Sequence, residues 1–220
     1  MTTNQMLSLL GQATVETLYM VFVSTAVSYI FALVLGTILF VTDENGILEC
    51  RPVNRVLGFI VNVGRSIPFI ILIIALQPFT RALVGTTIGA TATIVALIVS
   101  ATPFIARMVE SSLREVDAGV IEAAESMGST PFQIIWKVLL AEARPSILVG
   151  ATISTTTIIG YTAMASFVGA GGLGAVAVNY GYYRYETLIM IIVLVLIVIL
   201  VEVIQSVGMF IAKKTDKRIH

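Results

Sequence analysis

Residues 113–131 read LREVDAGVIEAAESMGSTP, a polar stretch in a chain that is otherwise apolar. The 220 residues are 57% apolar and 12% charged, and the mean hydropathy is +0.99. This composition excludes a soluble globular protein and indicates a membrane protein. A folded polar segment between two membrane spans can be bound by a soluble protein in the cytoplasm. The stretch therefore favours transport that is driven by a soluble partner.

Five long runs of apolar residues surround this stretch. A membrane-spanning helix needs about 20 apolar residues, and in lipid only a helix satisfies its own backbone groups span by span. We therefore predict an all-α membrane protein with five transmembrane helices in a single domain, 1–220, with a core at about 13–205. The runs lie between Glu16 and Asp43, from about Val56 to Leu76, between Arg81 and Arg107, from about Pro145 to Phe167, and from about Thr187 to Ala212.

Basic residues are concentrated in alternate loops. Ten of the 13 Lys and Arg residues fall in Asp43–Arg55, Arg107–Arg144 and the tail after Ala212, which includes Lys217 and Arg218. The positive-inside rule therefore predicts an outer N-terminus and a cytoplasmic C-terminus, with the tail near anionic lipid. No Lys or Arg precedes Arg51, so we expect the first span to be retained rather than cleaved as a signal peptide.

The chain has little capacity to bind a metal or a cofactor. Cys50 is the one cysteine and His220 the one histidine. These counts exclude an internal disulfide and argue against zinc and haem sites. We expect neither metal nor cofactor, and no nucleic-acid partner.

The polar stretch is predicted to fold as helix, bend and helix, a cytoplasmic loop at about 110–144. Gly128 fits a helix C-terminus with positive φ, Thr130 fits an N-cap, and Pro131 fits the first position of the next helix. Apolar residues at helical spacing precede the bend at Leu113, Val116, Val120, Ala124 and Met127, and follow it at Phe132, Ile135, Trp136 and Leu139. An alternative is a connector that packs only on its own helix bundle.

This loop resembles the EAA loop of ABC-importer permeases. Glu122-Ala123-Ala124 and Gly128 match the first half of that motif, whereas Val138 and Ala141 depart from its second half. The resemblance implies that the loop sits in a groove on an ATP-hydrolysing subunit, with coupling residues Glu122, Ala123, Ala124, Met127 and Gly128. The chain has no P-loop sequence, so the ATPase is expected on a separate polypeptide and this chain is not expected to be an enzyme.

A glycine loop follows the fourth span. Residues 169–174 read GAGGLG and formally match a dinucleotide fingerprint, which we reject because no strand precedes it. Val168–Gly174 is similar to the glycine loop of methionine, phosphonate and glycine-betaine permeases. Gly64–Phe69, Gln77–Thr80 and Gly85–Gly89 resemble the methionine branch specifically. This resemblance covers about Glu16 to Gln205.

Three residues within the spans are candidates for the transport pathway. Arg65 and Glu202 are the only charges deep within spans and lie at matched depth, which predicts a structural ion pair or a pathway charge. Met164 lies among the small residues Thr162, Ala163, Ala165 and Ser166, which predicts a gate near the symmetry axis of a dimer. The alternative is that Met164 fills a gap in the core.

The resemblance implies the type I ABC-importer permease fold in the bacterial inner membrane. It implies a homodimer, two cytoplasmic ATPase subunits, a periplasmic substrate-binding protein and contact with membrane lipid. The implied function is import of L- or D-methionine or a related amino acid by alternating access. Alternatives are a permease for another small solute such as phosphonate or glycine betaine, a secondary transporter, and an anchor subunit without a pore.

Overall fold

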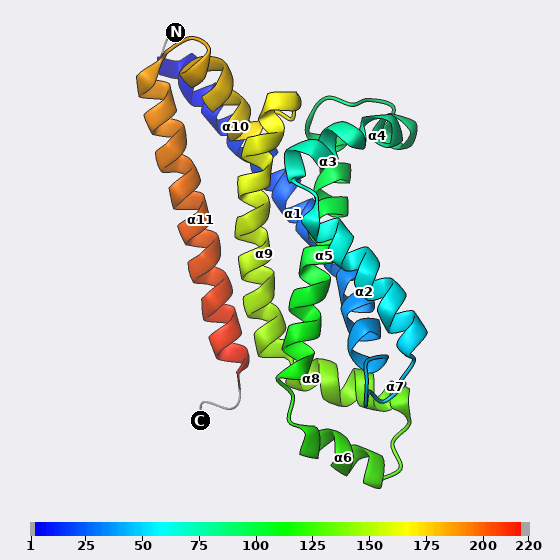
Figure 1. Cartoon of the computed structure of the whole chain (residues 1–220). Coiled ribbons are helices and arrows are strands. Elements are labelled where there is room, and N and C mark those ends of the chain that lie inside the picture. The colour runs from blue at the N-terminus through cyan, green and yellow to red at the C-terminus, as the bar shows by residue number, and fades with distance from the viewer. Residues whose placement is uncertain (1–2, 217–220) are drawn as a thin grey trace. The chain divides into compact units, whose positions relative to one another are not determined.

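The structure is a computed structural model that describes residues 3–216, so Lys217, Arg218 and His220 lie outside the described residues. Within that range every regular element is a helix, as predicted. The helices are α1 Thr3–Val41, α2 Arg51–Ser66, α3 Phe69–Ala75, α4 Gln77–Val84, α5 Ala90–Arg114, α6 Ala118–Ser126, α7 Pro131–Gln133, η1 Ile134–Leu139, α8 Leu140–Glu142, α9 Arg144–Ala165, η2 Ser166–Val168, α10 Gly172–Val176, η3 Ala177–Tyr182 and α11 Thr187–Thr215 (Figure 1).

Four of the described helices are long and apolar enough to cross a membrane without a break. They are α1, α5, α9 with its short extension η2, and α11. A fifth span results only if the bent pair α2 and α3 is counted as one. Four of the five predicted spans are therefore continuous helices, and the second corresponds to the bent pair α2 and α3.

The second predicted span, Val56–Leu76, was wrong in its continuity. Helix α2 ends at Ser66, Pro68 stands before α3, and α4 begins at Gln77, just beyond the predicted end of the span. The cause is Pro68, which lacks a backbone N–H and disfavours helical φ and ψ at the preceding Ile67.

The chain divides into two compact units, and each contains parts of several spans. The first unit consists of Met1–Val27, Ile67–Ala101 and Ser154–Gln205. Its core joins the start of α1, α10 and the start of α11 (Figure 1). The buried residues of this core are Leu10, Ala13, Leu173, Val176, Ile189 and Val193.

The second unit consists of Ser28–Ser66, Thr102–Ile153 and Ser206–His220. Here α1 and α5 approach closely at Gly36, where an added Cβ would lie 2.6 Å from the carbonyl oxygen of Ala106. Only glycine fits this contact, because any side chain would push the two backbones apart. The unit also contains α6, α7, η1 and α8, which lie beyond the neighbouring ends of α5 and α9 (Figure 1).

Candidate functional site

The predicted helix–bend–helix is present and is called the elbow below, defined as residues 117–143. Its first helix, α6, begins at Asp117, whose carboxylate accepts a hydrogen bond from the Gly119 N–H at 2.7 Å. Such an N-cap satisfies one of the backbone donors that a helix leaves unpaired at its start. Helix α6 therefore begins where local chemistry fixes it and projects beyond the end of α5 (Figure 1).

The bend after α6 depends on Gly128, which has φ of +77° as predicted. The Gly128 N–H donates to the Glu125 carbonyl at 2.9 Å, and the Ser129 N–H donates to the Ala124 carbonyl at 3.1 Å. This pair of bonds is a Schellman motif, which closes a helix with a left-handed residue. An added Cβ at residue 128 meets no heavy atom within 4 Å, so the conformation alone demands glycine here.

The return helix begins at Thr130 with a complete capping box. The Thr130 N–H donates to Gln133 Oε1 at 2.9 Å, and the Gln133 N–H donates to the Thr130 hydroxyl at 3.4 Å. Pro131 occupies the first turn, where a missing N–H costs nothing. The predicted roles of Thr130 and Pro131 are therefore confirmed, and both ends of the bend are rigidly defined.

The side chains of α6 divide into an inner and an outer set. Ala124 is 3% exposed, and α6 contacts η1, in which Ile134 and Leu139 are buried. The outer set is Glu122, Ala123 and Met127, which are all exposed. Of the predicted coupling residues, Ala124 thus supports the elbow from inside, while the outer set is available to a partner.

The helical spacing predicted before the bend holds only in part, because α5 ends at Arg114 and α6 starts only at Ala118. Leu113 and Val116 are buried before this break, whereas Val120 beyond it is exposed. After the bend, Phe132 is 74% exposed and Trp136 is 67% exposed, whereas Leu139 is buried as predicted and Ile134, which was not predicted, is buried with it. The π-helix η1 changes the rotation per residue, so an α-helical spacing does not predict which residues face inward.

An ion-pair network that the sequence analysis did not identify lies at the ends of α1 and α5, just before the elbow in the chain. The buried carboxylate of Glu110 accepts from Arg107 at 2.7 Å and from Arg114 at 2.8 Å. Arg114 also pairs with Asp43 at 2.5 Å, and this hydrogen bond, with one from the Glu44 N–H, holds the pKa of Asp43 below its ordinary value. The network joins the end of α1 to the end of α5 within the second unit.

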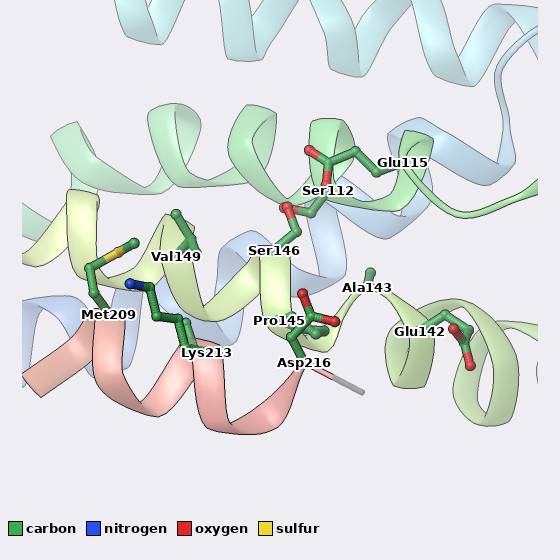
Figure 2. Close-up of a pocket in the computed structure, with 11 residues that line it drawn as sticks. Ser112, Glu115, Glu142, Ala143, Pro145, Ser146, Val149, Met209, Lys213 and Asp216 are labelled. Atoms are coloured by element: carbon green, nitrogen blue, oxygen red, sulfur yellow. The ribbon is translucent and has the colours of Figure 1, made fainter. Parts of the chain in front are cut away.

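A polar cleft of about 350 Å³ lies between the ends of α5 and α11 and the start of α9. The hydroxyls of Ser112 and Ser146 point toward each other and are 2.9 Å apart (Figure 2). Three carboxylates line the cleft, those of Glu115, Glu142 and Asp216. The ammonium group of Lys213 lines it as well. The described residues contain no cluster of His, Cys, Asp or Glu that could hold a metal.

In the first unit, the glycine loop is held by the first span. Gly169, Gly171 and Gly172 all have positive φ, so the chain bends there as predicted. The carboxylate of Glu16 accepts from the Gly172 N–H, and the hydroxyl of Thr17 accepts from the Leu173 N–H, both at 2.9 Å. Sequence reasoning missed these two α1 residues, because their partners lie 156 positions away.

The remaining candidates lie on exposed surfaces of the single chain. Arg65 belongs to the second unit and Glu202 to the first, and both side chains are exposed. Their pairing stays a prediction. Met164, on α9, is 51% exposed, so it does not fill a gap within its own chain. Its role as a gate also stays a prediction.

Comparison with known proteins relates this architecture to transport systems. Residues 46–219 match the model of the family described as "binding-protein-dependent transport system inner membrane component". The matched segment includes the elbow, the glycine loop and both π-helices.

Individual relatives match over nearly the full chain. The probable D-methionine transport system permease protein MetI of Vibrio cholerae is 50% identical over 96% of this chain and 93% of its own. The methionine import system permease protein MetP of Bacillus subtilis is 44% identical over 95% of this chain and 94% of its own. A solved structure of the MetNI methionine ABC transporter in inward-facing conformations is similar with a TM-score of 0.96 and 47% identity, covering 99% of this chain and 100% of that one.

Proposed function

This chain belongs to the family of binding-protein-dependent transport system inner membrane components, and we propose that it is the transmembrane permease subunit of an ATP-driven methionine importer. Two curated relatives that cover almost the whole chain are permeases of methionine transport. The chain is a multi-pass inner-membrane protein and not itself an enzyme. ATP hydrolysis resides on a separate subunit of the same transporter.

The structure of the elbow is the main support for a role in coupling this chain to the ATPase subunit. Its first helix is closed by an N-cap at Asp117 and by a Schellman motif at Gly128, and it presents Glu122, Ala123 and Met127 outward. A short, doubly capped helix transmits a displacement without fraying. The small Ala123 allows close backbone approach, while Glu122 offers a charge to a basic group or a backbone N–H. We propose that this outer set docks on the ATPase subunit.

In a homodimer with two ATPase subunits, docking of each elbow on an ATPase subunit would produce alternating access. ATP binding brings the ATPase subunits together, the two elbows follow, and the spans switch from inward-facing to outward-facing. A periplasmic substrate-binding protein delivers methionine to the outer mouth, and the N-terminus lies on that side. The ion-pair network of Glu110 joins the elbow end of α5 to α1, so movement of the elbow pulls on more than one span.

Three span residues complete the proposed pathway. In the homodimer two Met164 side chains meet at the symmetry axis and close the outer gate, which is compatible with their exposure on the single chain. We propose that Arg65 and Glu202 form an ion pair in the assembled permease. A double-mutant cycle with Arg65→Met and Glu202→Met that yields no coupling energy would dismiss this pair.

Transport assays on the reconstituted complex test the proposal. Proteoliposomes with ATP and the binding protein are expected to accumulate labelled methionine, and an ion gradient without ATP is expected to drive none. Excess phosphonate or glycine betaine should leave the uptake unchanged, whereas unlabelled methionine should abolish it. Uptake driven by a gradient alone would identify a secondary transporter, and competition by phosphonate or glycine betaine would assign a different solute.

A further inference from the structure

A second groove, also within the second unit, is apolar and carries a single positive charge. It has a volume of about 500 Å³ and lies between α1, η1, α8 and the start of α9, all within the second unit. Its lining includes Val34, Thr37, Trp136, Leu140, Arg144 and Leu148. No aspartate or glutamate lines it, in contrast to the polar cleft beside α11, which holds three carboxylates.

The position of the groove places it where a membrane span meets water. Its α1 residues lie near the Val41 end of one candidate span, and Arg144 is the first residue of another. Tryptophan is enriched at this depth because its ring is apolar and its N–H is polar. Trp136 lines the groove and is two-thirds exposed, so one side of the groove is open.

Arg144 has a charge that no residue within the described range 3–216 neutralises. Its side chain is exposed, and among the described residues it forms neither an ion pair nor a hydrogen bond. Lys137, on the same turn as Trp136, is exposed and likewise unpaired. The neighbouring carboxylate, Glu142, lines the other cleft. The groove is therefore electropositive at its rim and apolar along its walls.

We infer that this groove binds an anionic phospholipid, with the headgroup phosphate on Arg144 and an acyl chain along the apolar wall of α1 and α9. A guanidinium group matches phosphate oxygens in a two-pronged hydrogen bond. Basic pockets between spans are recognised sites for anionic headgroups. A neutral phospholipid fills the same apolar wall but brings no net negative charge to Arg144, so the site discriminates by headgroup charge.

The chain carries its own reporter of this site, because Trp136 is its single tryptophan. The complete transporter is reconstituted in phosphatidylcholine, and brominated phosphatidylglycerol or brominated phosphatidylcholine is titrated in while Trp136 fluorescence is recorded. The same complex with Trp136→Phe supplies the background from other subunits. We expect phosphatidylglycerol to half-quench Trp136 at about fivefold lower mole fraction, the equivalent of about 1 kcal/mol for one basic residue.

Substitutions at Arg144 show whether Trp136 is quenched because Arg144 recognises the headgroup charge or because Trp136 is exposed to any lipid. Arg144→Gln should abolish the preference, and Arg144→Lys should retain most of it. Arg55→Gln is the matched control, because Arg55 is exposed on α2 and lines none of the described cavities. Equal quenching by both lipids in the unsubstituted complex would overturn the inference. An equal loss of the phosphatidylglycerol preference in Arg55→Gln would also overturn it. So would the absence of any Trp136 quenching, which would mean that protein covers the groove. None of these readouts depends on methionine transport.

Discussion

At the scale of single residues, Ala123 and Ala124 are adjacent but face opposite environments, which makes them a matched pair. Ala123→Arg is expected to leave the permease folded and to weaken binding of the ATPase subunit by tenfold or more, about 1.4 kcal/mol. Ala124→Arg places a charge where the side chain is 3% exposed, so it should unfold the elbow itself. Co-purification of the ATPase subunit and protease cleavage of the elbow distinguish these outcomes. Normal ATPase binding by Ala123→Arg would remove the outer set from the docking surface.

Asp43 makes the stability of the second unit depend on pH, and the direction of the change follows from its lowered pKa. Its folded pKa is lowered, chiefly by the Arg114 hydrogen bond, so its contribution to stability is complete above the unfolded pKa of about 3.9. That contribution is lost as the pH falls through the lower folded value. Asp43→Asn should therefore cost up to about 1 kcal/mol at neutral pH, and the deficit should shrink below about pH 4. Thermal unfolding against pH measures this, and a deficit that grows in acid would contradict it.

The residues that sequence alone predicted correctly are those whose roles are local. Gly128 and Thr130 form hydrogen bonds within a few positions, so the residue types and their order are sufficient. The orientation of Trp136 was wrong because it depends on η1, whose wider turn has no composition signal. The Arg107–Glu110–Arg114 spacing was available in the sequence, but the Asp43 partner lies 71 positions away.

At the scale of elements, α1 clamps the glycine loop through Glu16 and Thr17. Thr17→Val keeps the side-chain shape but removes the acceptor for the Leu173 N–H, which is buried with its partner. We expect a loss of about 1–3 kcal/mol for a buried donor left without a partner. Thr14→Val is the control, because the Thr14 hydroxyl bonds only the Leu10 carbonyl of its own helix. Thermal unfolding of the purified complex should separate the two variants, and equal losses would argue against the clamp.

The elements themselves were predictable where a long charge-free run exceeds the span length. The α2–α3 break was not predicted, because the apolar run continues across it and hydropathy does not register backbone geometry. Pro68 was the signal that could have identified the break, since proline excludes the helical bond that a continuous span needs there. The glycine loop was predicted to bend, and its positive φ values confirm the bend.

At the scale of the whole molecule, the spans leave apolar surface that another chain or lipid must cover. The most apolar window of α11 is only 11% buried within the chain, and Met164 of α9 is half exposed. The single domain predicted over 1–220 stays a prediction; the matched family segment, 46–219, includes parts of both compact units.

The proposed gate is tested by disulfide cross-linking across the homodimer. Met164→Cys in a Cys50→Ser background provides one thiol per chain, since Cys50 is the only native cysteine. We expect cross-linking in nucleotide-free membranes and several-fold less with ATP trapped, because the outer gate then opens. Cross-linking that never occurs, or that ignores nucleotide, would remove Met164 from the gate.

The central claim is that the elbow couples ATP hydrolysis to methionine transport, and Gly128 tests it most directly. An added Cβ there meets no atom of this chain, so within the permease a substitution changes only how well φ of +77° is tolerated. Asparagine accepts this conformation far better than the β-branched valine. ATP-driven methionine uptake should therefore persist in Gly128→Asn and fall at least tenfold in Gly128→Val, while both proteins insert normally. Equal uptake by the two variants would contradict the account.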